Sequence, residues 1–359
     1  MEINNRHKKD NIWITVTLAF ILISFCLLGS ITIYIDPFFH YHAPLANYEY
    51  PITNERYQNN GITRHFEYDS IITGTSMTEN FKTSEADKLF NATFIKIPYS
   101  GGGYKEIDDS LELAYKYNKN IKYVIRALDY SRLIKDKDLY RTDVEYPTYL
   151  YNDNPFDDVN YFLNKTILFD RTMKVIKYTK DGNKTTTFDE YVNWMSEYEF
   201  GKKSVLASYS LEDPQPPREL TDEERRMVSE NIQQNVTELI SAHPETTFYL
   251  FFPPYSICYW DMAKNDGTLD SQIDAEQMVI EELVKYPNVK LYSFCNNAEL
   301  VCNLEHYRDP AHYDEWVNSQ ILQWLQNDEY LLTKENYTDY IQTKREFYNN
   351  YDYSSLHDK

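Results

Sequence analysis

Three residues far apart in the chain have side chains that together can carry nucleophilic catalysis. Ser76 ends the segment Gly74-Thr75-Ser76, and Asp309 and His312 stand three apart in Asp309-Pro310-Ala311-His312. A serine hydroxyl needs a base to take its proton, and a carboxylate on the other ring nitrogen orients such a base. Ser76, His312 and Asp309 are therefore candidates for nucleophile, base and orienting acid. Each motif alone has a simpler interpretation, as a turn, a helix cap or a solvated helix start.

A glycine-rich loop offers candidate donors to an anion. Ser100-Gly101-Gly102-Gly103 holds three of the nine glycines of the chain. Glycine lets the backbone approach a ligand closely and present its N–H groups. Gly101 or Gly102 is thus a candidate oxyanion donor, although a tight turn between a strand and a helix explains these glycines equally well.

The elements that must position these residues alternate between strands and helices. Short apolar runs predict strands over Ser70–Gly74, Phe94–Tyr99, Lys122–Leu128, Thr247–Pro253 and Val289–Phe294. Amphipathic segments predict helices over Ser84–Phe90, Lys105–Asn118, Asp222–His243, Ala275–Lys285 and Tyr313–Gln326. The third helix follows a capping box that begins at Thr221. This alternation predicts an α/β fold around a parallel sheet.

Ligands of such sheets bind at the carboxyl ends of the strands. Ser76 follows the first strand, the loop from Gly101 to Gly103 follows the second, and His312 comes after the last. Tyr255, at the end of the fourth strand, either lines the same cleft or packs as an ordinary tyrosine. We therefore expect the candidate residues to converge at one edge of the sheet.

Two segments depart from the alternation. Residues 135–215 are rich in Tyr, Asn, Asp and Lys and predict an insertion with some helix, placed as a lid over one edge of the sheet. Residues 331–359 are polar and Tyr-rich and predict a C-terminal tail that packs on the surface, either as a helix or as a frayed segment. The main domain is expected to span residues 61–330.

The N-terminus predicts a membrane anchor. Residues 12–35 contain no charged residue, and 24 residues reach about 36 Å as a helix, enough to cross a hydrocarbon core of about 30 Å. Arg6, Lys8 and Lys9 precede this run, which predicts that residues 1–11 stay in the cytoplasm and residues 36–359 lie outside. A cleaved signal peptide is the alternative, but its apolar region is usually shorter and ends in small residues. Residues 36–60 are then a juxtamembrane stalk.

Composition excludes several classes of function. The formal charge of −20 argues against a nucleic-acid partner, which needs a basic face. The apolar fraction of 42% is enough to fill a core, which argues against global disorder. Of the four cysteines, Cys295 and Cys302 can pair in an oxidising compartment or remain free thiols.

The order of these motifs resembles the SGNH/GDSL hydrolase superfamily. Within it, the chain is similar to membrane-anchored bacterial envelope proteins related to the teichoic-acid D-alanylation protein DltD and to polysaccharide O-acetyltransferases. The similarity covers residues 36–330 apart from the insertion. It is carried by Asp36-Pro37-Phe38-Phe39-His40-Tyr41-His42, by the stretch from Tyr68 to Phe81, by Tyr99-Ser100-Gly101-Gly102, by Leu128-Asp129-Tyr130 and by Tyr307-Arg308-Asp309-Pro310-Ala311-His312-Tyr313.

The resemblance implies a three-layer α/β/α sandwich with flavodoxin-like strand order. It makes Ser76 the nucleophile, His312 the base and Asp309 its partner, with an oxyanion N–H from Gly101 or Gly102. The superfamily commonly places an Asn after the third strand as a further oxyanion donor, whereas this chain has Asp129. A carboxylate facing an oxyanion is repulsive, so Asp129 is expected to be turned away, protonated or structural.

The expected function is acyl-group chemistry on an envelope polysaccharide or teichoic-acid-like polymer, as a transferase or an esterase. The resemblance implies a membrane-bound O-acyltransferase as partner and no cofactor. A non-catalytic glycan-binding or scaffold protein is the alternative. A metal site at His40 and His42 is only weakly indicated, because no carboxylate cluster accompanies them.

Overall fold

The structure, a computed structural model, describes residues 2–357 and divides the chain into two compact units. One unit combines residues 1–65 with 146–186, and the other combines residues 66–145 with 187–359. The division differs from the sequence-based one, which kept residues 135–215 together as an insertion in the main domain. Only residues 146–186 of that segment lie outside the main domain, because they pack with the N-terminal residues.

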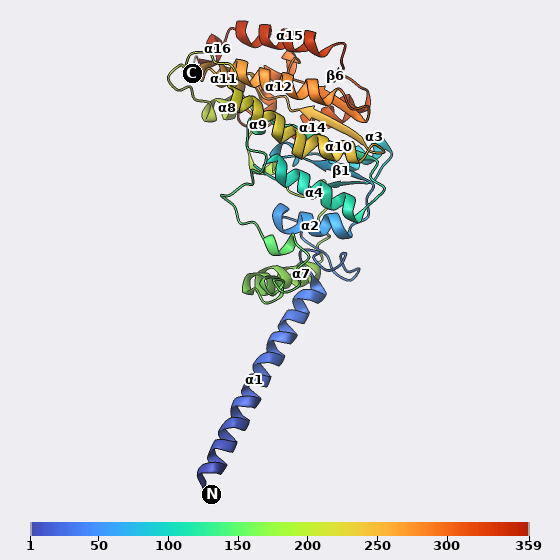
Figure 1. Ribbon diagram of the computed structural model, residues 1–359, viewed down its shortest axis with the longest axis vertical. Coiled ribbons are helices and arrows are strands. Elements are labelled where there is room, and N and C mark those ends of the chain that lie inside the picture. Colours follow the sequence, from blue (N-terminus) through green and yellow to red (C-terminus); the bar gives the residue numbers. More distant parts are fainter. Residues whose placement is uncertain (1, 358–359) are drawn as a thin grey trace. The chain divides into compact units, whose positions relative to one another are not determined.

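The first unit is built on the N-terminal helix. Its elements are α1 (Glu2–Ile35), α2 (Glu55–His65), η2 (Thr148–Leu150), α6 (Val159–Phe162), the π-helical η3 (Ile167–Thr172) and α7 (Met173–Lys180). Residues Asn11–Ile35 of α1, drawn in blue in Figure 1, are long and apolar enough to cross a membrane, and the mean hydropathy of their most apolar 18 residues is 2.4. Phe38, Leu150, Tyr161 and Ile167 form a buried core in this unit.

Asp36 holds the chain where it leaves α1. Its buried carboxylate accepts the backbone N–H groups of His40, Tyr41 and His42 at 2.7–3.0 Å and the Tyr161 hydroxyl at 2.5 Å. The ring Nε2 of His40 lies 3.2 Å from Asp158, and the ring of His42 contacts backbone carbonyls. These two histidines are not part of a metal-ligand cluster. Within residues 2–357, no group of three or more His, Cys, Asp or Glu side chains is arranged to hold a metal ion. The segment after α1 is therefore a hydrogen-bonded turn.

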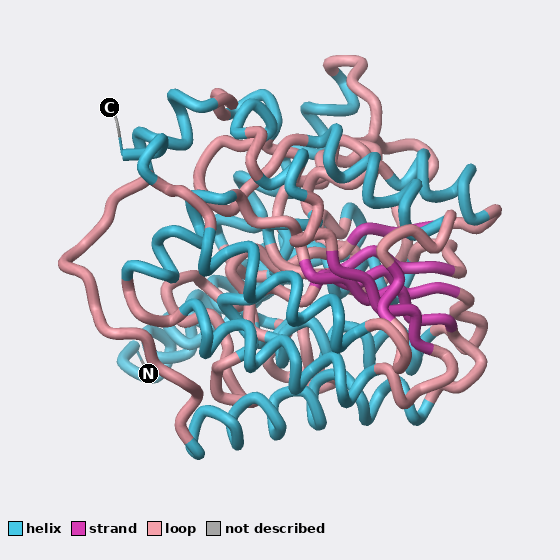
Figure 2. The backbone as a smooth tube through the Cα atoms, turned by 90° about the horizontal axis from the view of Figure 1, so that it is seen from above, coloured by secondary structure: helices cyan, strands magenta, loops and turns pink. Residues whose placement is uncertain are grey.

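The second unit contains a six-stranded, mostly parallel sheet, drawn in magenta in Figure 2. The strands are β1 (Ser70–Thr73), β2 (Phe94–Lys96), β3 (Tyr123–Ala127), β4 (Thr247–Phe252), β5 (Val289–Ser293) and β6 (Leu331–Leu332). Their order is β2-β1-β3-β4-β5-β6, with β6 antiparallel to β5. The five predicted strands are confirmed and end one to three residues earlier than expected, whereas β6 was not predicted.

Helices lie on both faces of the sheet. The helices of this unit are η1 (Ser76–Thr78), α3 (Thr83–Phe90), α4 (Tyr104–Tyr117), α5 (Tyr130–Leu133), η4 (Met195–Glu197), α8 (Lys202–Ser208), α9 (Asp222–Ile232), the π-helical η5 (Gln233–Thr237), α10 (Glu238–Ala242), α11 (Ile257–Asn265), α12 (Leu269–Leu283), α13 (Ala298–Val301), η6 (Leu304–His306), α14 (Glu315–Gln326), α15 (Tyr337–Asn350) and α16 (Ser354–His357). α3 packs against α14, whereas α4, the continuous helix α9–α10 and α12 adjoin in succession. Right-handed crossovers place these two groups on opposite faces.

The C-terminal segment is largely helical, which is one of the two expected alternatives, and it packs more firmly than its polar composition suggested. α15 lies against α12, and its Lys344 is fully buried. The Lys344 ammonium pairs with Glu276 and donates to the Tyr130 hydroxyl at 2.7 Å. Polar composition suggested a surface position because the partners of Lys344 lie far away in the sequence.

All four cysteines are free thiols, so Cys295 and Cys302 do not pair.

Candidate active site

Ser76 stands on a sharp turn at the end of β1. Gly74 has φ +152°, and a Cβ there would lie 2.7 Å from Thr78 Cγ2, so only glycine fits this turn without displacement. The turn leads directly into η1, of which Ser76 is the first residue. The first N–H groups of a helix have no acceptor inside it, so the Ser76 N–H is available beside its own hydroxyl.

His312 and Asp309 occupy a loop that closes on itself before α14. The Arg308 N–H donates to His312 O at 3.0 Å, and Pro310 O accepts the N–H and the hydroxyl of Ser256 at 3.0 and 2.7 Å. The last helix was expected to start at Tyr313, directly after His312, but it starts at Glu315 behind its N-cap Asp314. The loop therefore fixes the imidazole and the carboxylate by backbone bonds rather than by helical geometry.

The structure brings Ser76, His312 and Asp309 together. His312 Nε2 lies 2.9 Å from Ser76 Oγ, and His312 Nδ1 lies 2.8 and 3.0 Å from the two Asp309 oxygens. The backbone N–H groups of His312 and Ala311 also donate to Asp309, at 2.8 and 2.9 Å. This is the arrangement expected of a nucleophile, a base and the carboxylate that orients it.

Asp309 is held in its charged form. Partial burial raises its pKa, but hydrogen bonds and charge from His312 and the two backbone N–H groups outweigh burial and lower the pKa to about 2. The anion favours a proton on the His312 nitrogen that faces it, which leaves Nε2 free to accept the Ser76 proton.

Three residues around this triad were missed by the sequence analysis. The Arg308 guanidinium carbon lies over both the Trp194 and the Tyr198 ring, at 4.0 and 3.9 Å from their centroids, and Arg308 Nε donates to Asp309 at 3.2 Å. The Trp194 ring meets the His312 ring edge to face, with centroids 5.8 Å apart. The position of Arg308 next to Asp309 was a signal for its role. Nothing in the sequence around Trp194 and Tyr198 indicated theirs, because they lie more than a hundred residues from the loop.

The glycine loop supplies fewer donors than expected. The Gly102 N–H donates to Tyr99 O at 2.8 Å, and the Gly103 N–H donates to Glu106 at 3.0 Å. These bonds form the turn and cap α4, so the proposed role of Gly102 as an oxyanion donor does not fit this loop. Gly101, with φ +61° and its carbonyl bound by Arg132, remains the candidate donor of the loop.

Asp129 and Tyr255 bind each other instead of lining a cleft. The Asp129 carboxylate accepts the Thr75 hydroxyl and the Tyr255 hydroxyl, each at 2.7 Å. Both Asp129 and Tyr255 are buried, and burial raises the pKa of Asp129 although both hydrogen bonds lower it. Of the three alternatives for Asp129, the structural one fits best, because both oxygens are engaged. Tyr255 supports Asp129 and is not a surface for substrate.

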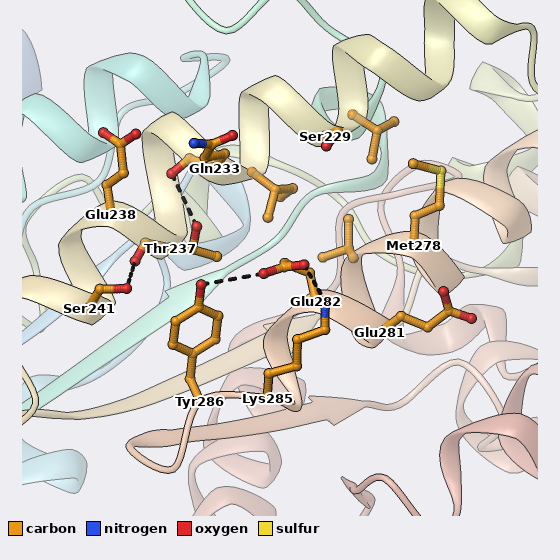
Figure 3. Close-up of a pocket in the computed structure, with 13 residues that line it drawn as sticks. Ser229, Gln233, Thr237, Glu238, Ser241, Met278, Glu281, Glu282, Lys285 and Tyr286 are labelled. Atoms are coloured by element: carbon orange, nitrogen blue, oxygen red, sulfur yellow. Dashed lines mark hydrogen bonds and ion pairs between the residues drawn. The ribbon is translucent and has the colours of Figure 1, made fainter.

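A groove of about 610 Å³ lies elsewhere on this unit, between the helix α9–α10 and α12 (Figure 3). Apolar residues such as Val228 and Ile232 share its lining with Glu238, Glu281 and Glu282. The interactions drawn in Figure 3 are local ones, such as Lys285 to Glu282 at 2.7 Å. The lining of the groove includes none of the predicted site residues, so the groove is separate from the candidate active site.

Comparisons with known proteins assign no family to this chain. No protein-family model matches the sequence, and no curated protein matches it at a significant level.

Proposed function

We propose that this protein is a membrane-anchored serine acyltransferase or esterase of the SGNH type that acts on an envelope polymer. One observation carries the proposal: Ser76 Oγ, His312 Nε2 and Asp309 form a continuous hydrogen-bonded chain at the carboxyl end of β1. Residues 236 positions apart meet there with distances of 2.8–2.9 Å. A merely structural serine does not need a base oriented in this way.

The chemistry follows from this chain of contacts. Ser76 Oγ attacks the carbonyl carbon of an acyl ester while His312 Nε2 takes the hydroxyl proton, and the Ser76 N–H donates to the oxyanion that forms. The imidazolium then returns the proton to the departing alcohol, leaving an acyl-Ser76. In the second half, a hydroxyl of the acceptor gives its proton to His312 and attacks the acyl carbon. The bond between the acyl carbon and Ser76 Oγ then breaks, and the imidazolium returns the proton to Ser76 Oγ. A sugar hydroxyl as acceptor gives transfer, and water gives hydrolysis.

The membrane and polymer parts of the proposal rest on other observations. α1 is long and apolar enough to span a membrane, and the basic residues before it favour an extracytoplasmic position for the rest of the chain. The strand order β2-β1-β3-β4-β5 is that of flavodoxin-like sheets, as an SGNH sandwich requires. An anchored transferase of this kind would receive its acyl group from a membrane-embedded acyltransferase.

The deciding experiment is labelling of the full-length protein with a fluorescent fluorophosphonate. Wild-type protein should be labelled, and Ser76→Ala should not, whereas Ser84→Ala, which removes another partly buried hydroxyl that is bound to Asp189, should keep the label. Loss of acyl groups from the envelope polymer in Ser76→Ala cells at matched protein level would then establish the substrate class.

The membrane topology is tested separately. Protease added to intact cells should digest the main domain, and protection of that domain until lysis would overturn its proposed extracytoplasmic position.

A non-catalytic glycan-binding or scaffold role is the second candidate. It is favoured by the engagement of Gly102 and Asp129 in internal hydrogen bonds, which leaves the oxyanion site with fewer donors than the superfamily pattern has. Resistance of wild-type protein to the fluorophosphonate, with full polymer acylation in Ser76→Ala cells, would favour this role.

A further inference from the structure

The first unit exposes a series of large apolar side chains on α6, η3 and their flanking residues. Phe156, Val159, Leu163, Phe169 and Met173 are between 38% and 89% exposed, and we refer to these five as the apolar face. Single exposed apolar residues are ordinary on protein surfaces. Five within eighteen consecutive positions indicate a surface that meets something other than water.

The helices that carry this face pack against the apolar part of α1. A methyl group at Gly29 would lie 3.0 Å from the Phe162 ring and 3.7 Å from Leu163, and α1 also contacts η3. Gly29, Thr32 and Ile35 are buried, although most of α1 is exposed. Gly29 precedes the end of α1 by six residues, or about 9 Å along the helix axis. α6 and η3 therefore lie beside the last turns of the segment that can span a membrane (Figure 1).

The same region carries unpaired positive charge. Residues 164–180 contain Lys165, Arg171, Lys174, Lys177 and Lys180 against a single acid, Asp170, so their net charge is 5 − 1 = +4 in a chain of −20. All four lysines are exposed, and within residues 2–357 none of the five cations forms an ion pair. Basic residues beside an apolar surface are typical of segments that lie in the interface of an anionic membrane.

We propose that residues 156–173 insert the apolar face into the membrane leaflet at the C-terminal end of α1, with Lys165, Lys174 and Lys177 at the lipid phosphates. The occupant is the lipid bilayer, because the face is continuous with the part of α1 that lies in it. This second contact limits the tilt and rotation of the first unit about its anchor. The inference rests on the proposed anchoring by α1, and the experiment below separates the two.

The experiment measures quenching of tryptophan fluorescence by brominated lipids. Full-length protein is placed in nanodiscs of phosphatidylcholine and phosphatidylglycerol, with bromine either near the carbonyl end or near the middle of the acyl chains. Phe169→Trp and Phe156→Trp report on the apolar face, Leu22→Trp on the middle of α1, and Leu211→Trp on an exposed side chain of the second unit. The fluorescence of wild-type protein is subtracted each time.

Shallow bromine should quench about half of the added fluorescence of Phe169→Trp and Phe156→Trp and none of that of Leu211→Trp, while deep bromine quenches Leu22→Trp. Quenching of Leu22→Trp without quenching of either face probe would overturn the inference and leave the anchor in place. It would mean that the apolar face lies away from the acyl chains. Absence of quenching in Leu22→Trp would overturn the anchor and the inference together.

Discussion

The Arg308 guanidinium carbon lies over the Trp194 ring, 4.0 Å from the ring centroid. Tyr198, whose ring is nearly perpendicular to that of Trp194, also lies under the guanidinium carbon, with its centroid at 3.9 Å, and Arg308 Nε donates to Asp309. Trp194 in turn packs against the His312 ring. The acid and the base of the proposed triad are thus held by a common aromatic and cationic support. Arg308 acts on Asp309 and not on the reacting atoms, which makes it a positioning residue.

Substitution of Arg308 should lower kcat more than it changes KM. Lysine keeps the charge but loses the planar guanidinium over the two rings and the Nε bond, so Arg308→Lys and Arg308→Gln should each lower kcat about tenfold, equivalent to about 1.4 kcal/mol. The measurement is hydrolysis of p-nitrophenyl acetate, with Arg226→Gln, which removes an exposed arginine, as the control. An unchanged kcat with a raised KM would mean that Arg308 binds substrate instead.

The proposed triad should behave as one unit. Ser76→Ala and His312→Ala should each remove nearly all turnover, and the double variant should be scarcely worse, because either loss already abolishes proton transfer from the nucleophile. Asp309→Asn should keep more activity, since it disturbs the base without deleting it. The assay is the acyl content of the envelope polymer in cells with matched protein levels. Additive losses in the double variant would show that Ser76 and His312 act separately.

Asp309 should make stability depend on pH in the acidic range. Its pKa of about 2 in the folded protein is below the ordinary value of 3.8, so the folded state binds a proton less readily than the unfolded state. The resulting stabilisation, about 2 kcal/mol, is present above about pH 4 and is lost as the pH falls toward 2. Urea unfolding of wild-type protein and Asp309→Asn should give curves that converge over this range. Parallel curves would contradict the assigned environment of Asp309.

Asp129 should make stability depend on pH in the opposite direction from Asp309. Burial raises its pKa in the folded state, so its contribution is most favourable below pH 4 and is lost as the pH rises through the folded pKa. Asp129→Asn does not titrate, so the stability of wild-type protein relative to this variant should fall with rising pH. Asp129→Leu should cost about 1–3 kcal/mol for each of the Thr75 and Tyr255 hydroxyls left without an acceptor. Equal stability of the Asn and Leu variants in urea would exclude this bonding.

The buried ion pair of the C-terminal helix should be sensitive to removal of one partner. Lys344→Met leaves the Glu276 carboxylate unpaired in the core and should cost about 3–5 kcal/mol of unfolding free energy. Adding Glu276→Gln removes that charge but keeps an acceptor for Tyr130 and Tyr340, so the double variant should recover part of the loss. Thermal unfolding compares the three proteins. A double variant that is less stable than Lys344→Met would argue against an electrostatic cause.

The sequence by itself determined the local elements and the order of the chemical groups. The five long strands, the helix from Thr221 and the apolar segment of α1 are set by side-chain periodicity and length, which act over neighbouring residues. Parallel strands align their carboxyl ends, so the positions of Ser76 and His312 after the first and last of the predicted strands already implied that they meet. Their contact at 2.9 Å agrees with this inference.

Only the tertiary structure decided which distant residues pair with these groups. Four contacts join residues more than fifty positions apart. They are the cation–π contact of Arg308 with Trp194, the hydrogen bond from Tyr255 to Asp129, the buried ion pair of Lys344 with Glu276 and the packing of Phe162 beside Gly29. No periodicity connects such residues, because their contact depends on how whole elements pack rather than on local conformation. For the same reason composition did not show that residues 146–186 pack with the N-terminal residues, or that the C-terminal helix buries the ammonium of Lys344.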